Sequence, residues 1–155
     1  MNPEMEHCQN QLKQKGYKLT EQRRNIIRIF LASDKHLMNA AQIYERVKEQ
    51  NIKMNCSTVY RNLETLMETG LIKKVSMQDG TSSYEYNRHQ HHHHLICMEC
   101  GDAEIIHYCP FSEMNQYIQE KTNFQPVEHR FEIYGYCSKC RNKRKRDEAN
   151  DHHGN

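Results

Sequence analysis

The sequence predicts an α+β protein built from two small domains. In the first half, three segments with helical spacing of apolar residues are followed by two strand-like segments joined at a turn. In the second half, short strands and one helix lie between two Cys-x-x-Cys pairs. The hydrophobic fraction is only 36%, so each core must be small and a bound metal ion is a suitable supplement.

Composition restricts the class of protein. The N-terminus lacks a basic segment followed by an apolar one, and no apolar run is long enough to cross a bilayer. We therefore expect a cytoplasmic protein without a membrane partner, whose thiols stay reduced and can bind metal. The formal net charge is +2, so binding to nucleic acid must depend on local clusters of basic residues.

The first three helices are predicted from apolar spacing and capping residues. Residues 5–15 are polar with sparse apolar positions and predict a short, weak helix. Thr20 is a suitable N-cap for a second helix that ends near Ala32, and Asn39 begins a third helix that ends near Asn51. The apolar residues of these two helices recur at helical intervals: Ile26, Ile27, Phe30, Leu31, Ile43, Tyr44 and Val47.

A fourth helix over residues 57–69 ends at Gly70, a residue suited to the left-handed conformation that follows many helices. Residues 71–77 and 82–86 then predict a β-hairpin around the Asp79-Gly80 turn. Helices with a short turn before the last one, followed by a hairpin, are typical of a winged helix-turn-helix. We place this domain at residues 1–86.

In a winged helix-turn-helix the last helix enters the major groove of double-stranded DNA with its N-terminal residues on base edges. Arg61 can contact guanine, and Tyr60 can contact a thymine methyl group or a phosphate. The alternative is that Tyr60 packs in the core and Arg61 is an ordinary surface charge. The predicted DNA-binding residues are Lys18, Thr20, Arg23, Ser57, Thr58, Tyr60, Arg61, Lys73 and Lys74.

The second domain follows a polar hinge at residues 87–93 and covers residues 94–140. We expect strands at 95–97, 103–106 and 127–136, and a helix from Pro110 to about Thr122. This α/β unit is thin, and its exposed sheet edge and aromatic helix favour a homodimer interface. The basic polar tail, residues 141–155, reads as a disordered solvated segment, with a phosphate-contacting arm as the alternative.

The two cysteine pairs, Cys97 with Cys100 and Cys137 with Cys140, can supply four thiolates to a structural zinc ion. Disulfides or a redox-active pair are the alternatives. The gap between the pairs exceeds that of a compact zinc ribbon, so the pairs must clamp the ends of a small domain. Of the other cysteines, Cys56 is interpreted as a buried filler, and Cys8 receives no role.

Four consecutive histidines lead directly into Cys97. If this segment is extended, His92 and His94 point to one side, and His91 and His93 to the other. One stretch of chain could thus supply ligands to two further metal sites.

With these motifs in view, the chain resembles the ferric-uptake-regulator family of metal-sensing repressors. The resemblance spans about residues 17–140 and is carried by YKLTEQR (17–23), TVYRNL (58–63), HHHHLICMECG (91–101) and HRFEIYGYC (129–137). It implies a dimer, an N-terminal winged helix, a C-terminal dimerisation domain and a structural zinc on the four cysteines.

The resemblance also implies two further metal sites. The regulatory hinge site matches Glu85, His92 and His94, with His89 as a possible further ligand. The second site matches His91, His93 and His129. Its carboxylate position falls on Ser112, so the neighbouring Glu113 is the substitute.

Two departures reduce the ligand set of the hinge site. The histidine that many iron and peroxide sensors carry before the third helix is Leu37, and the acid that usually follows the second cysteine is Ile105. A hinge site reduced in this way and rich in histidine favours zinc over iron or manganese. Segments 108–110 and 131–135 also look like zinc-uptake regulators, although the cysteine that these often carry near Asn87 is missing.

The sequence therefore predicts a zinc-sensing repressor with zinc as corepressor, acting on a palindromic operator and controlling metal-uptake genes. Iron-, manganese- or peroxide-sensing repressors of the same family are the alternatives, and peroxide sensors use Asp where Glu85 stands. A zinc-dependent enzyme lacks a fitting motif here, so no catalytic residue and no small-molecule substrate is expected. A thiol switch on Cys56 and Cys109 is a third class.

Overall fold

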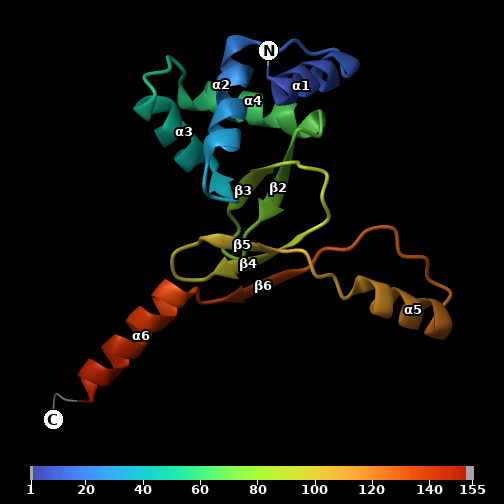
Figure 1. The fold of residues 1–155 in the computed structure, drawn as a ribbon, viewed down its shortest axis with the longest axis vertical. Helices are drawn as coiled ribbons and strands as arrows, with labels where there is room; N and C mark the ends of the chain where they lie inside the picture. Colours follow the sequence, from blue (N-terminus) through green and yellow to red (C-terminus); the bar gives the residue numbers. More distant parts are fainter. Residues whose placement is uncertain (1, 153–155) are drawn as a thin grey trace. The chain divides into compact units, whose positions relative to one another are not determined.

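The computed structural model describes residues 2–152 and divides the chain into two compact units, Met1–His89 and Gln90–Asn155 (Figure 1). The division falls inside the segment predicted as a hinge. Residues 153–155 of the predicted tail, and Met1, lie outside the described residues. Within residues 2–152, no helix has both the length and the apolar character that crossing a membrane would need.

The first unit contains helices that each begin at a side-chain cap. Asn2, Thr20, Asn39 and Asn55 each accept a hydrogen bond from a backbone N–H in the first turn of the helix that follows. The helices are α1 (Pro3–Gln14), α2 (Glu21–Ala32), α3 (Ala40–Glu49) and α4 (Cys56–Glu68).

The core of this unit lies between the four helices and includes α1, which the sequence predicted only as a weak helix. Cys8 and Leu12 of α1 are fully buried and belong to the same core cluster as residues of α2 and α4. The Cys8 sulfur also lies 3.3 Å from the Tyr86 hydroxyl, and Gln11 donates to the Thr69 carbonyl. Cys8 is therefore a core residue, and α1 is packed onto the domain rather than leading loosely into it.

A small antiparallel sheet completes the unit, with strand order β1-β3-β2. Its hairpin pairs β2 (Ile72–Ser76) with β3 (Ser82–Tyr86), as predicted, and Gly80 in the turn has φ +84°. The strand β1 (Met38–Asn39) was not predicted, because two residues are too few to show alternation. These elements confirm the winged-helix prediction.

The second unit has a sheet of order β5-β4-β6, in which β4 is antiparallel to β5 and parallel to β6. The strands are β4 (His93–Cys97), β5 (Ala103–Ile106) and β6 (Glu132–Gly135), and the helices are α5 (Phe111–Lys121) and α6 (Ser138–Asp151). Figure 1 shows both helices extending away from the sheet. Buried side chains in this unit cluster on β4, and neither helix has a buried residue.

Two predictions for this unit were wrong. The strand expected at 127–136 is confined to β6, since β4 is short and its pairing with β6 runs only from His94–Glu132 to Cys97–Gly135. The tail expected to be disordered forms α6 as far as Asp151. Its lysine, arginine, glutamate and alanine residues favour a helix, but they leave no apolar stripe by which a helix would be predicted.

Candidate metal centres and nucleic-acid interface

The four predicted zinc ligands lie together in the second unit. The sulfurs of Cys97, Cys100, Cys137 and Cys140 are all within 4.8 Å of one another, and those of Cys100 and Cys137 are 3.9 Å apart. Four sulfurs around one zinc ion at Zn–S distances of about 2.3 Å would be separated by roughly 3.8 Å. All seven cysteines of the chain are free thiols, so the arrangement fits a metal cage rather than disulfides.

Backbone N–H groups stabilise a negative charge on one sulfur of this cage, that of Cys97. Burial raises the pKa of the Cys97 thiol, but backbone N–H groups of Cys100, Cys137 and Glu99 outweigh burial and bring that pKa to about 6. The hydrogen bond with Cys137 raises the pKa of Cys140 to about 12. The cage thus readily accepts one negative charge, whereas four thiolates at this spacing require a cation to balance them.

A tight turn and the start of α6 position the four cysteine sulfurs. Cys97 and Cys100 flank a tight turn in which the Gly101 N–H donates to the Cys97 carbonyl, and Gly101 has φ +74°, a conformation that favours glycine. Cys137 is the N-cap residue of α6, and Cys140 lies in the first turn of this helix. The start of α6 thus brings two of the four sulfurs into the cage.

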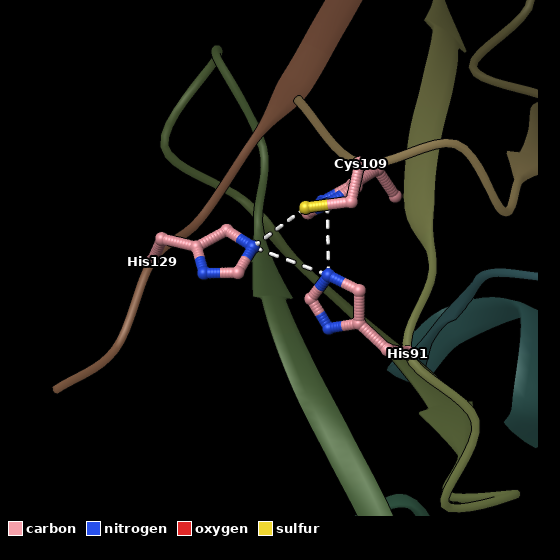
Figure 2. A group of neighbouring side chains, drawn as sticks. His91, Cys109 and His129 are labelled. Carbon is pink, nitrogen blue, oxygen red and sulfur yellow. Dashed lines mark hydrogen bonds between the residues drawn. The ribbon is translucent and has the colours of Figure 1, made fainter. Parts of the chain in front are cut away.

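A second cluster joins three histidines and a cysteine, of which Figure 2 labels His91, Cys109 and His129. The His129 Nε2 lies 3.1 Å from the His91 Nε2 and 3.2 Å from the Cys109 sulfur. The His91 Nε2 lies another 3.1 Å from the His93 Nε2. These four ligand atoms all lie within 4.8 Å of one another.

Aromatic rings enclose this cluster. Phe111 stacks on the His129 ring with centroids 4.1 Å apart, and Phe131 meets the buried His93 ring edge-on at 5.4 Å. Burial, followed by the neighbouring His91 and His129, lowers the pKa of His93. The lowered pKa favours the neutral form of His93, which is the form that binds metal.

The carboxylate predicted for this cluster is not part of it. Glu113 lies exposed in the first turn of α5, and the described residues that gather with the three histidines include Cys109 instead. The sequence signal for this cysteine is its position one residue before Pro110, at the start of the helix that carries Glu113. The family resemblance implies a carboxylate at this place instead.

The predicted hinge ligands belong to both units. His92 and His94 lie in the second unit with ring centroids 5.0 Å apart, and the His107 ring, which sequence reasoning missed, is 6.4 Å from His92. Glu85 is buried on β3 of the first unit. His89 is exposed, has φ +56°, and its ring meets that of His7 at 6.0 Å.

The predicted DNA-contacting residues of α4 lie on its exposed N-terminal end. Tyr60 is 49% exposed, so it does not pack in the core, and the exposed Arg61 side chain reaches back to the Thr58 hydroxyl at 3.4 Å. Arg23 is less available, since its guanidinium donates to the Lys18 carbonyl and lies over the Tyr17 ring. Thr20 caps α2, and the remaining residues of the set are exposed: Lys18, Ser57, Lys73 and Lys74.

Comparison with known proteins gives a consistent result. The model of the ferric uptake regulator family matches residues 14–134. The chain is 32% identical over 146 residues to the ferric uptake regulation protein of Bacillus subtilis, covering 92% of this chain and 98% of that one. It is 33% identical over 138 residues to the peroxide-responsive repressor PerR of Staphylococcus epidermidis, covering 89% and 91%.

A solved structure shares the fold. The Vibrio cholerae ferric uptake regulator superposes with a TM-score of 0.72 at 26% identity, over 81% of this chain and 96% of that chain. Proteins of this family are transcription regulators, which confirms the prediction that the chain is not an enzyme.

Proposed function

We propose that this chain, which belongs to the ferric uptake regulator family, is a repressor whose corepressor is zinc. The family consists of metal-responsive, dimeric DNA-binding repressors, so control of DNA binding by a metal follows from membership. The identity of the metal, the residues that sense it and the form of the operator are specific to the proposal. Because DNA is the partner, the protein would act in the cytoplasm.

The donor set is the observation that carries the choice of zinc. The proposed sensing set of Glu85, His92 and His94 supplies two imidazoles and only one carboxylate. The two other clusters of candidate ligands, in the described part of the second unit, consist of imidazole nitrogens and cysteine sulfurs. Zinc is commonly bound by four nitrogen or sulfur ligands, whereas iron(II) and manganese(II) favour more ligands and carboxylate oxygens. The four-cysteine cage would hold a structural zinc ion, and His91, His93 and His129 would belong to a second site.

Iron is the alternative with a specific observation in its favour, because the Bacillus subtilis relative is named for ferric uptake. Another relative is named for its response to peroxide. Glu85 stands where the resemblance gives peroxide sensors an aspartate, which favours a metal sensor over a peroxide sensor.

The proposed sensing site is the hinge set of Glu85, His92 and His94, with His89 as a further ligand. Glu85 belongs to the first unit, and His92 and His94 belong to the second. One ion bound by groups from both units would restrict the angle between them and favour the conformation that binds DNA. Typical couplings of this kind change affinity by roughly 5- to 150-fold.

In the proposed function, α4 is the helix that contacts DNA. Exposed Tyr60 and Arg61 near its N-terminus can reach base edges, and exposed Lys73 and Lys74 on β2 can contact phosphates. Two copies in a dimer would present two such helices to the half-sites of a palindromic operator. Exposed Met114 and Tyr117 of α5 in the second unit offer apolar surface for the dimer.

The test is DNA binding as a function of free metal. A DNA fragment is selected from a random-sequence pool with zinc-loaded protein, and its affinity is measured with buffered zinc, iron(II) or manganese(II) under anaerobic conditions. Because zinc binds most sites more tightly than iron(II) or manganese(II), the extent of the response at saturation is compared. We expect saturating zinc to give the tightest DNA binding and saturating iron(II) or manganese(II) to leave it close to that of the protein without added metal. If saturating iron(II) or manganese(II) promotes DNA binding as strongly as zinc, the choice of zinc is wrong.

The hinge is tested with the double variant Glu85→Ala/His92→Ala. Its DNA binding should no longer respond to zinc, because both units lose a ligand. The matched control is Glu6→Ala/His152→Ala, which removes the same two chemical groups at exposed positions and should respond like the wild type. Tight DNA binding by the first double variant in excess chelator would contradict the hinge mechanism.

A further inference from the structure

We propose that Cys109 is a metal ligand, so that His91, His93, Cys109 and His129 form a thiolate-containing site selective for zinc-like ions. The inference rests on the second metal site of the proposed function and deepens it. The fourth ligand becomes a sulfur instead of the Glu113 carboxylate, and this change alters which ions the site prefers.

Protons alone do not satisfy the contacts in this cluster. Three close contacts join its atoms in a chain, from the Cys109 sulfur to His129, then to His91, then to His93. Each contact requires one hydrogen and one lone pair. A ring N–H points in a single direction in the ring plane, and every histidine here uses its Nε2 atom.

If the Cys109 thiol donates to His129, the His129 Nε2 carries a lone pair and cannot donate to His91. His91 can then donate to His129 or accept from His93, but its single Nε2 atom cannot do both. Any neutral arrangement that starts from this thiol bond therefore leaves at least one of the three contacts without a hydrogen bond of its own. A cation at the centre removes the conflict, because all four atoms then direct lone pairs towards it.

The spacing also fits such an ion. Around zinc, with Zn–N distances of about 2.0–2.1 Å, tetrahedral nitrogens are roughly 3.3 Å apart, and a nitrogen and a sulfur are roughly 3.6 Å apart. The observed nitrogen–nitrogen contacts are 3.1 Å and the sulfur–nitrogen contact is 3.2 Å. Small outward shifts of these side chains would complete the tetrahedron.

Neighbouring residues hold the four groups in place. His91 and His93 come from one segment, on the same side of an extended stretch, and His93 is buried. His129 is fixed by Phe111, which stacks on its ring only two residues after Cys109. Since the same segment supplies the sulfur and the ring that orients His129, the site is built by local packing.

The sulfur determines which ions the site would select. Three neutral imidazoles and one thiolate carry a single negative charge and suit zinc or cobalt(II). A carboxylate in the fourth position would suit manganese better. Cys109 therefore gives this site a preference that Glu113 would not.

The experiment uses the full-length protein with zinc retained in the four-cysteine cage, titrated anaerobically with cobalt(II). A thiolate bound to cobalt gives an intense charge-transfer absorption, and imidazole alone does not. We expect about one equivalent of cobalt to produce this band in the wild type. Zinc analysis after the titration must still give one ion per chain, which shows that cobalt did not enter the cage.

The variant Cys109→Ser should lose the band and bind cobalt at this site at least about tenfold more weakly, because one of four ligands is gone. Glu113→Ala tests the carboxylate, and Cys56→Ser removes an exposed cysteine of the other unit. Both should keep the wild-type band and affinity. Retention of one zinc ion by every variant shows that each second unit is folded.

Selectivity provides a second readout. In competition between zinc and manganese(II), Cys109→Asp should shift the ratio of affinities towards manganese by at least about tenfold relative to the wild type. Three results would overturn the inference: no charge-transfer band in the wild type, an unchanged band in Cys109→Ser with cage zinc retained, or an equal loss of cobalt affinity in Glu113→Ala. None of these measurements involves DNA, so their failure is distinguishable from failure of the proposed repressor.

Discussion

The two units of this chain differ in the interactions available to stabilise each of them. In the first unit, apolar residues from every helix are buried in one core, and each helix begins at a side-chain cap. In the described part of the second unit, the buried apolar residues are Ile96 and Cys97, and neither helix starts with a capping hydrogen bond from a side chain. The second unit instead gathers eight candidate metal ligands in two clusters.

This difference indicates where a metal ion matters for folding. Burial of apolar surface contributes roughly 25 cal/mol per Å², so a unit with almost no buried apolar side chains gains little from it. Structural zinc in small domains contributes folding free energy directly. We therefore expect the first unit to be stable without metal and the second to depend on it.

The largest effect should follow loss of the structural ion through Cys137→Ser. Serine is a good N-cap for α6, so helix propensity favours this variant, but a hydroxyl does not replace a zinc thiolate. Zinc binding contributes about 10–16 kcal/mol of apparent free energy in zinc-finger peptides, which is comparable with the whole stability of a small domain. We expect the second unit to unfold, as measured by amide hydrogen exchange, with protection of the first unit unchanged.

The same experiment has a matched control in Cys56→Ser. Cys56 is exposed at the start of α4, so its interpretation as a buried filler was wrong, and it lies outside both ligand clusters of the second unit. Its variant should keep normal protection in both units. Undiminished protection of β4 and α6 in Cys137→Ser would show that the second unit does not need the cage.

A smaller effect, confined to the first unit, should come from Leu63→Ala. Leu63 is 1% exposed in the core of the first unit, and truncating a buried leucine typically costs about 2–5 kcal/mol. Chemical denaturation should show this loss for the first unit, and metal analysis should show full zinc content. Glu64→Ala, at an exposed position of the same helix, should change stability by no more than about 0.5 kcal/mol. Loss of zinc from Leu63→Ala would contradict the independence of the two units.

The same contrast explains how far the sequence predicted the fold. The first unit follows apolar periodicity and capping residues, so Thr20, Asn39 and Gly70 marked real helix ends. The role of α1 was underestimated because its buried face is carried by Met5, Cys8 and Leu12 in an otherwise polar stretch. Periodicity does not show that so few residues are enough to join a core.

In the second unit the sequence predicted which candidate ligands lie together better than it predicted secondary structure. The four cysteines gather because their spacing matches a cage, and His91 and His93 share a side because an extended segment alternates. Cys109 was missed as a ligand because the histidines of its cluster lie 16 or more residues away along the chain, a proximity that follows only from the fold. The helix α6 was missed because it has no apolar face to detect.

The smallest effect should come from a cap in the first unit, Asn39→Ala. The Asn39 side chain accepts from the Gln42 N–H at 2.8 Å, and the Gln42 side chain accepts from the Asn39 N–H at 2.9 Å. Losing the side-chain acceptor of this reciprocal pair should cost about 1 kcal/mol, because the core still holds α3 in place. Thermal unfolding of the first unit measures the loss, and Asn39→Asp, which keeps an acceptor, is the control. Complete unfolding of the first unit by Asn39→Ala would show that its stability depends on one local contact and not on its apolar core. The contrast with the metal-dependent second unit would then be wrong.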